Sequence, residues 1–261
     1  MAMLIEFNID RFAIHNGFVL VIVNRSFQGS WLPDRPGAEV DKTKIVTFCT
    51  NFRYNFHTRD NLKAQEMKDV CEEISANVNF STYDAFICFI SSHGDEGNAI
   101  YGVDGNSVTV DEIVSQFKGI PSLANKPKLF FMQNCRGRNI DLGQSAVMEQ
   151  AEVQADHGSR PPTPIRLPIE ADILVSYSSV DGYEPYRDVS TGSWFITKLT
   201  EILNEHEPNM NLTDLLSMVN KRVARVDSRG RKQMPCFTST LRKPVYFKMR
   251  RIGRTLTPDL L

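Results

Sequence analysis

The chain has 261 residues, 41% of them hydrophobic and 23% charged, an ordinary globular composition that excludes a largely disordered protein. Its 30 lysines and arginines balance 31 aspartates and glutamates, so the net charge of −1 gives no support to a role on nucleic acid or on a membrane surface. No apolar run reaches the ~18 residues that span a bilayer.

The first half of the chain alternates buried strands with helices. A continuous apolar run predicts a strand at 18–23, and apolar residues at helical spacing then predict helices that contain 40–48 and 62–74. Two further apolar runs predict strands at 85–90 and 128–132. Uninterrupted runs of this length are typical of strands covered on both faces, as in a largely parallel sheet.

The second half continues the same alternation. It has a predicted strand at 173–177, helices that contain 194–203 and 212–226, and a last strand at 237–247. Strands that alternate with helices of this length predict an α/β fold with one central sheet.

Between the halves lies a segment without sustained periodicity. Residues 137–171 follow neither helical nor strand spacing, and four prolines crowd into the stretch 161–168. A structureless stretch this long inside a compact domain is usually functional or disordered. We therefore expect two halves, 1–136 and 172–261, which share one sheet across a linker at 137–171.

The five cysteines are widely spaced, with no Cys-x-x-Cys pair and no cluster at zinc spacing. Free thiols of this kind indicate a reducing compartment, so we expect a cytoplasmic protein without metal or cofactor. Cys49, Cys71 and Cys88 fall on apolar helix or strand positions and are interpreted as small core residues, and Cys236 as a further residue at the start of a strand.

Cys135 differs from the other cysteines because it stands where a buried strand gives way to a loop. His93 stands in an equivalent place after the strand at 85–90. Chemistry in open α/β sheets gathers at such carboxyl ends. If the two strands are neighbours, an imidazole and a thiol face each other there, which is the minimal apparatus of cysteine-dependent acyl transfer. From placement alone, coincidence is the more frequent explanation.

The surrounding motifs resemble the caspase family. Gln-Asn-Cys-Arg-Gly at 133–137 is similar to the caspase nucleophile motif Gln-Ala-Cys-(Arg/Gln/Gly)-Gly, and His93 lies upstream at about the expected separation. Further segments resemble caspases, among them Phe-Ile-Ser-Ser-His-Gly-Asp-Glu-Gly at 89–97 and Gly-Ser-Trp-Phe-Ile at 192–196. The resemblance runs from about residue 17 to 248.

The resemblance implies a single caspase-like domain with a mostly parallel six-stranded sheet flanked by helices. It also implies a cysteine endopeptidase that cuts protein substrates after aspartate in apoptotic or related signalling. By the same resemblance Cys135 is the nucleophile, His93 the general base and acid, and the backbone N–H groups of Gly94 and Cys135 the oxyanion hole.

By resemblance, three positions would hold the substrate aspartate: Arg35, Gln133 and Arg187. Arginine suits this task because its planar fork grips both oxygens of a carboxylate. Tyr186 would form the wall of the adjacent subsite. The alternative is that both arginines are ordinary solvent-facing loop residues.

One departure from the motif leaves a rival interpretation open. Asn134 stands where caspases usually have alanine, and an inward amide needs a hydrogen-bond partner or costs stability. The rival is a catalytically weak or silent caspase-like regulator that acts through dimerisation. A cysteine peptidase of basic specificity is a third interpretation, disfavoured because two arginines in the pocket would repel Lys or Arg.

Processing and partners follow from the same resemblance. We expect cleavage within the linker after Asp156 and consider Asp172, at the linker's edge, a second processing site. Expected partners are protein substrates with exposed Asp-containing loops and a second copy of the chain, joined through the last strand, whose exposed edge is otherwise an aggregation liability. No nucleic acid or membrane partner is expected.

Overall fold

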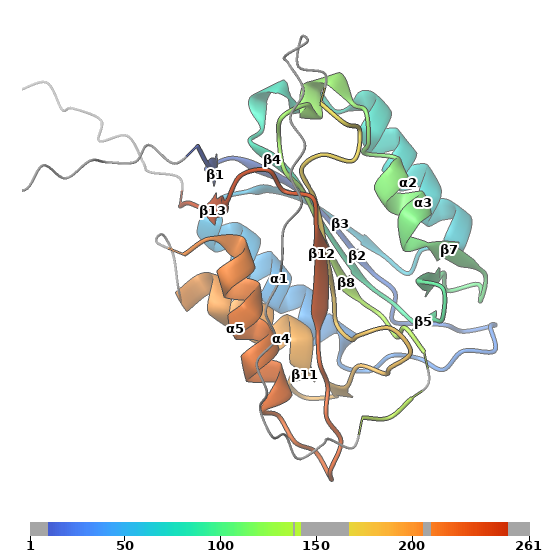
Figure 1. Ribbon diagram of the computed structural model, residues 1–261. Helices are drawn as coiled ribbons and strands as arrows, with labels where there is room; N and C mark the ends of the chain where they lie inside the picture. Colours follow the sequence, from blue (N-terminus) through green and yellow to red (C-terminus); the bar gives the residue numbers. More distant parts are fainter. Residues whose placement is uncertain (1–9, 138, 142–166, 206–209, 250–261) are drawn as a thin grey trace, which may run out of the picture.

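The computed structural model describes residues 10–137, 139–141, 167–205 and 210–249. Its centre is a six-stranded sheet in the order β12-β9-β8-β4-β2-β3 (Figure 1). The strands are β2 (Gly17–Val23), β3 (Asn55–Asp60), β4 (Ala85–Ser91), β8 (Lys128–Gln133), β9 (Ile173–Tyr177) and β12 (Cys236–Ser239). All neighbours in this sheet are parallel except β12, which runs antiparallel to β9. The predicted α/β fold with a mostly parallel six-stranded sheet is confirmed.

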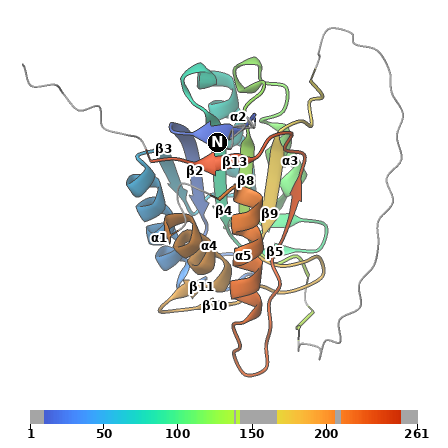
Figure 2. The ribbon, with the colours of Figure 1, turned by 60° about the vertical axis from the view of Figure 1, so that its left-hand side comes forward.

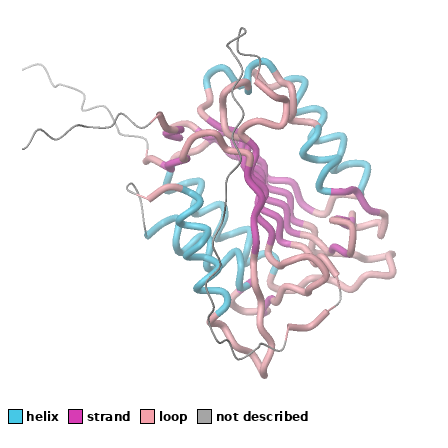
Figure 3. The backbone as a smooth tube through the Cα atoms, in the orientation of Figure 1, coloured by secondary structure: helices cyan, strands magenta, loops and turns pink. Residues whose placement is uncertain are grey.

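Helices cover both faces of this sheet (Figure 3). The helices are α1 (Ala38–Phe52), α2 (Ala64–Asn77), α3 (Val110–Ser115), α4 (Trp194–Glu205) and α5 (Leu212–Ala224). One core joins α1, α4 and α5 to one face, and a second core joins α2 and α3 to the other. Alternate residues of each strand enter different cores, as Val19 and Leu20 do, so both faces are buried and the strand sequences read as continuous apolar runs.

The two halves of the chain build this sheet together. β9 and β12 come from the second half, and they extend a sheet whose other four strands come from the first half. A second link joins the halves outside the sheet, where β1 (Phe12–Ile14) pairs in parallel with β13 (Val245–Phe247). Figure 2 shows β13 beside α5 and near the start of β2.

The predicted last strand at 237–247 is wrong as a single element. The chain leaves the central sheet after β12, turns where Arg242 bonds Asp172, and re-forms a strand only at β13. Pro244 lies in this turn and lacks the N–H that a continuous ladder would need.

Several short strands gave no sequence signal. β3 is an edge strand with the sequence Asn-Phe-His-Thr-Arg-Asp, in which every residue except Phe56 is polar and none is fully buried, so no apolar run marks it. β5 (Gly94–Asp95), β6 (Ala99–Tyr101) and β7 (Ser107–Thr109) form a small antiparallel sheet after β4. β10 (Arg187–Asp188) and β11 (Gly192–Ser193) form a two-stranded ribbon before α4.

Candidate active site

His93 and Cys135 lie at the same edge of the central sheet. β4 and β8 are adjacent parallel strands whose register pairs Ser91 with Gln133. Each candidate stands two residues beyond its paired position, so the two side chains emerge together. Both residues are half-buried and line one cavity of about 170 Å³. The placement expected from the strand ends is therefore what the structure has.

The His93 imidazole is held by neighbours that fix its tautomer. Its Nε2 lies 2.8 Å from the carbonyl oxygen of Pro33, and its ring packs edge-on against Phe27 at 4.7 Å. A carbonyl oxygen only accepts, so Nε2 carries the proton and Nδ1 keeps a lone pair that can act as a base. Burial, with a further contribution from Arg35 and Arg187, lowers the pKa of His93 from 6.5 to about 4.

The Cys135 thiol is protonated at rest. Burial is the largest cause that raises its pKa, and Glu184 adds to the effect, whereas Arg35 and Arg187 oppose it. A thiol with a raised pKa and an imidazole with a lowered one form a neutral pair. In a pair of this kind the imidazole can take the thiol proton, which generates the nucleophilic thiolate.

Gly94 is required by close packing of the backbone beside the candidate nucleophile. A Cβ atom at this position would lie 2.4 Å from the Cys135 carbonyl oxygen and 2.7 Å from that of Ala99. No side chain fits in this space. The absence of one lets the backbone that follows His93 lie directly against the backbone of Cys135.

Three polar side chains from distant parts of the chain line the same cavity: Arg35, Gln133 and Arg187. Arg35 comes from the loop before α1, Gln133 from the end of β8 and Arg187 from β10. Arg35 is only 3% exposed, and Gln133 only 2%. The alternative that Arg35 is a solvent-facing loop residue is therefore wrong, and Arg187 is half-buried rather than fully exposed.

Both guanidinium groups bond to uncharged acceptors. Arg35 donates to the carbonyl of Asn24 (2.7 Å) and to the Ser91 hydroxyl (3.1 Å), and Arg187 donates from Nε to the carbonyl of Pro36 (2.9 Å). Within the described residues neither has an ion-pair partner. Burial, and next the charge of Arg187, lowers the pKa of Arg35 to about 9. A buried and a half-buried guanidinium group without an ion-pair partner form a site for an anion.

A buried carboxylate behind this cavity was missed by the sequence analysis. Asp41, fully buried in α1, accepts hydrogen bonds from the backbone N–H (2.7 Å) and hydroxyl (3.1 Å) of Ser193. Its charge raises the pKa values of both Arg35 and Arg187, so it partly offsets the repulsion between them. Burial in turn raises the pKa of Asp41 itself. The signal was available, because Asp41 occupies the same helix face as Ile45 and Phe48.

The comparisons with known proteins agree on one family. A model of the caspase domain matches residues 16–246. The chain belongs to the caspase family. It is 33% identical over 243 residues to caspase-3 of Bos taurus, which covers 88% of this chain and 84% of that protein. It is 34% identical over 237 residues to caspase-3 of Xenopus laevis, with 88% and 80% covered. The resemblance carried by the sequence motifs is thereby confirmed, and the family is one of cysteine peptidases.

Asn134, the departure from the caspase motif, forms its hydrogen bonds with backbone carbonyls and not with the arginine pair. The Asn134 side chain is buried and donates from Nδ2 to the carbonyl of Cys135 (3.0 Å) and, at 3.4 Å, to that of Ala99. It thus links the carbonyl of Cys135 to β6. Its Oδ1 has no hydrogen-bond partner among the described residues.

Tyr186 lies beside the arginine pair in this caspase chain. Its backbone N–H donates to the Gln233 side chain (2.8 Å), its ring packs at 5.0 Å against Trp194, and the Arg231 guanidinium lies 5.6 Å above it. Tyr186 also lines the cavity that holds Cys135.

The structure argues against Asp172 as a processing site. Asp172 is fully buried at the start of β9, and its carboxylate accepts hydrogen bonds from the Arg242 guanidinium and backbone. A protease cannot reach the peptide bond after Asp172 without unfolding the edge of the sheet. Asp156 lies outside the described residues.

The described part of the chain offers no group of three or more histidine, cysteine, aspartate or glutamate side chains arranged to hold a metal ion. None of its helices combines the length and the apolarity that crossing a membrane requires.

Proposed function

We propose that the protein is a cysteine endopeptidase that hydrolyses peptide bonds after aspartate in protein substrates, in the cytoplasm and in apoptotic or related signalling. The observation that carries the proposal is the pair of guanidinium groups, of buried Arg35 and half-buried Arg187, in one cavity with Cys135. Their charge is unmatched by any ion pair among the described residues. An aspartate side chain of the substrate would supply the missing carboxylate.

The proposed reaction begins with binding of the substrate aspartate to Arg35, Arg187 and the amide of Gln133. This places the carbonyl carbon of that aspartate against the Cys135 sulfur. Nδ1 of His93 takes the thiol proton, and sulfur adds to the carbonyl carbon. Backbone N–H groups of Gly94 and Cys135 would stabilise the resulting oxyanion.

The intermediate then collapses in two stages. His93 gives its proton to the leaving amine, the C–N bond breaks, and a thioester remains on Cys135. A water molecule, deprotonated by His93, attacks the thioester, and the carboxylic acid product leaves as sulfur regains its proton. The two arginines also lower the pKa of His93, and they lower the pKa of the Cys135 thiol against the effect of burial. The proposed specificity pocket therefore acts electrostatically on both groups of the proposed catalytic pair.

A panel of peptides that differ only at the residue before the cut tests this function. We expect turnover of the aspartate peptide alone, with loss of at least ~10³-fold in Cys135→Ala. Cys236→Ala is the matched control, since Cys236 is also half-buried and lies at the start of β12. Cleavage of lysine or arginine peptides would contradict the specificity. No turnover of any peptide would favour the silent regulator.

Maturation is proposed to occur through cleavage after Asp156, which separates a large half from a small half. The first half supplies Cys135 and His93, and the second half supplies Arg187, so the site needs both. Expression of the wild-type chain beside Cys135→Ala tests self-processing. The same two fragments in the variant would show that another protease makes the cut.

Dimerisation is proposed through β12, which is the edge strand of the central sheet. Thr238 and Ser239 are exposed there, and Phe237 is half-buried. An unpaired edge of this kind readily accepts a second strand. Sedimentation at micromolar concentration is expected to show a dimer, and a monomer before and after cleavage would contradict the proposal.

A further inference from the structure

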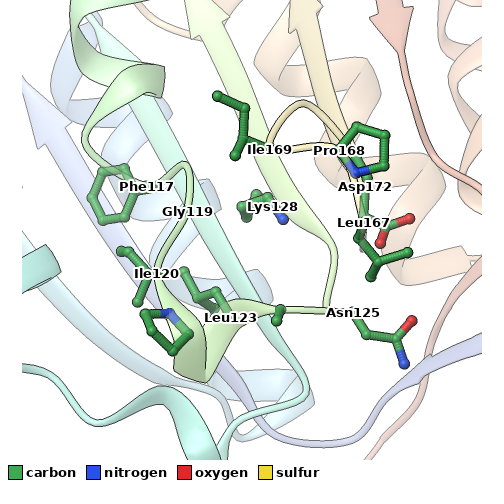
Figure 4. Close-up of a pocket in the computed structure, with 13 residues that line it drawn as sticks. Phe117, Gly119, Ile120, Leu123, Asn125, Lys128, Leu167, Pro168, Ile169 and Asp172 are labelled. Carbon is green, nitrogen blue, oxygen red and sulfur yellow. The ribbon is translucent and has the colours of Figure 1, made fainter. Parts of the chain in front are cut away.

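A second cavity lies at the opposite end of β8 and β9 from Cys135. Its volume is about 420 Å³, and its wall is mostly apolar, with Phe117, Ile120 and Leu123 on one side and Leu167 on the other. Figure 4 shows Lys128, the first residue of β8, in the middle of these residues. Pockets of this size commonly hold small organic ligands.

Lys128 is an unusual residue for such a wall. It is only 5% exposed, and its ammonium group donates one hydrogen bond, to the carbonyl of Lys126 (3.1 Å). An ammonium group can donate three. In the part of the chain that the structure describes, Nζ of Lys128 has no ion-pair partner.

The nearest carboxylate is already occupied. Asp172 also lines the cavity, but its two oxygens accept hydrogen bonds from the Arg242 guanidinium, and Arg242 bonds Asn125 as well. Glu170, on the same segment, pairs with Lys118 (2.8 Å). Asp172 acts on Lys128 only through its charge, since its oxygens accept from Arg242, and no carboxylate of the described residues forms an ion pair with the ammonium group of Lys128.

We propose that this cavity, which we call the Lys128 pocket, binds a small amphipathic carboxylate. The apolar body of the ligand would lie against Ile120, Leu123 and Leu167, and its carboxylate would accept hydrogen bonds from the ammonium group of Lys128. A buried cation without an anion is costly, and a ligand of this chemistry supplies both the charge and the apolar surface. The pocket is separate from the arginine pair beside Cys135.

Calorimetric titration of the full chain with octanoate and, separately, with octanol tests the proposal. The Cys135→Ala variant keeps the chain intact during the measurement. We expect one octanoate per chain, bound at least tenfold more tightly than octanol, because the two probes share the apolar body and differ in charge. Equal affinity for the two probes, or no binding of either, would overturn the proposal.

Two variants show whether the binding takes place in this pocket. Lys128→Met keeps an unbranched side chain but removes the charge, so this variant should bind octanoate and octanol with about equal affinity. Ala124→Trp places a large ring at the exposed rim of the pocket and does not alter Lys128, so it should abolish binding of both probes. This variant tests the location of the ligand independently of whether Lys128→Met folds.

Ser217→Trp, at an exposed position of α5 away from the pocket, is the matched control and should bind octanoate like the parent. Octanoate binding that persists unchanged in Ala124→Trp would place the ligand elsewhere, for example at Arg35 and Arg187, and would overturn the assignment.

Discussion

Each end of the central sheet holds two cationic side chains and one buried aspartate, but these groups are paired differently at the two ends. At the amino end, the Arg242 guanidinium forms an ion pair with the Asp172 carboxylate. At the carboxyl end, Asp41 bonds Ser193 instead, and Arg35 and Arg187 bond uncharged oxygens. The first arrangement pairs its arginine with its carboxylate, whereas the second leaves both arginines open to a ligand.

Unsatisfied polar atoms follow the same division. Among the described residues, the buried side-chain atoms without a hydrogen-bond partner are Asp41 Oδ2, Gln133 Oε1, Asn134 Oδ1 and Tyr186 Oη. All four belong to the carboxyl end, beside or behind Cys135. Buried polar groups are ordinarily paired, so an accumulation of unpaired ones marks a place where stability is given up for binding.

The largest expected effects come from two variants, one at each end of the sheet, whose activity and stability are both measured. Arg35→Gln should lower kcat/KM for aspartate peptides by at least ~30-fold, since the variant lacks one of the two cations proposed to bind the substrate carboxylate. Its stability should fall less than that of Arg242→Gln, because no ion pair is broken and the glutamine amide can still donate a hydrogen bond in place of the guanidinium. Steady-state kinetics and thermal unfolding measure the two effects.

Arg242→Gln should behave in the opposite way. It leaves Asp172 buried and unpaired, which costs on the order of 2 kcal/mol or more of unfolding free energy. The kcat/KM of the protein that remains folded should stay within about threefold of wild type. If both variants lose activity equally, or if Arg35→Gln unfolds, the contrast between the two ends is wrong.

The second test concerns the pKa of His93. Burial and the two open arginines lower it to about 4, so the imidazole remains a neutral base at pH 5, where an ordinary histidine is mostly protonated. Activity should therefore persist down to about pH 5 and disappear as the pH falls through about 4. NMR titration of the imidazoles in Cys135→Ala measures the pKa directly, with His93→Gln to assign the resonance.

Arg187→Gln sharpens this test, because loss of its positive charge should raise the pKa of His93. Arg242→Gln, at the other end of the sheet, should leave it unchanged. An unchanged pKa of His93 in Arg187→Gln would contradict the electrostatic link between the arginine pair and His93.

These tests rest on residues that the sequence revealed to different degrees. Cys135 and His93 could be placed from the sequence because continuous apolar runs mark β4 and β8, and parallel neighbours end at one edge. Arg35 and Arg187 carry no such pattern, since loop arginines are common, and only the resemblance to caspases selected them. Asp41 was missed although it shares a helix face with Ile45 and Phe48, because an aspartate in the first turn of a helix is usually solvent-exposed.

The fold shows the same limit. Strands buried on both faces were found at nearly their full length, since burial leaves a composition signal. β3 was not found, because an edge strand with a solvent-facing side keeps polar residues. The division of the last strand into β12 and β13 depends on the contact between Arg242 and Asp172, which are far apart in sequence.

A third test asks what the buried carboxylate at the carboxyl end does. Asp41 raises the pKa of Arg35, which burial holds at about 9. Asp41→Asn keeps an oxygen that can accept from Ser193 but removes the charge, so the pKa of Arg35 should fall further. The pocket then loses its cation at a lower pH, and the alkaline limb of kcat/KM should move toward neutral. At pH 9 activity should fall by up to ~10-fold for each further unit, with little change at pH 7.

Asp84→Asn is the control for Asp41→Asn, because Asp84 also accepts backbone N–H bonds, from His15 and Asn16, but lies far from the arginine pair. Its pH profile should match that of wild type. An unchanged alkaline limb in Asp41→Asn would show that the role of Asp41 is purely structural.

The smallest expected effect compares two tyrosine hydroxyls, one at each end of the sheet. Tyr186 Oη is buried without a hydrogen-bond partner among the described residues, whereas Tyr54 Oη donates to the carbonyl of Ile14 at 3.0 Å. Removal of a satisfied buried hydroxyl costs about 1 kcal/mol, whereas removal of an unsatisfied one costs nothing. Tyr54→Phe should therefore lower the unfolding free energy by ~1 kcal/mol, and Tyr186→Phe should leave it unchanged or slightly raised. Denaturant unfolding of both variants resolves the difference. A loss in Tyr186→Phe as large as that in Tyr54→Phe would mean that the carboxyl end satisfies its polar atoms as fully as the amino end does.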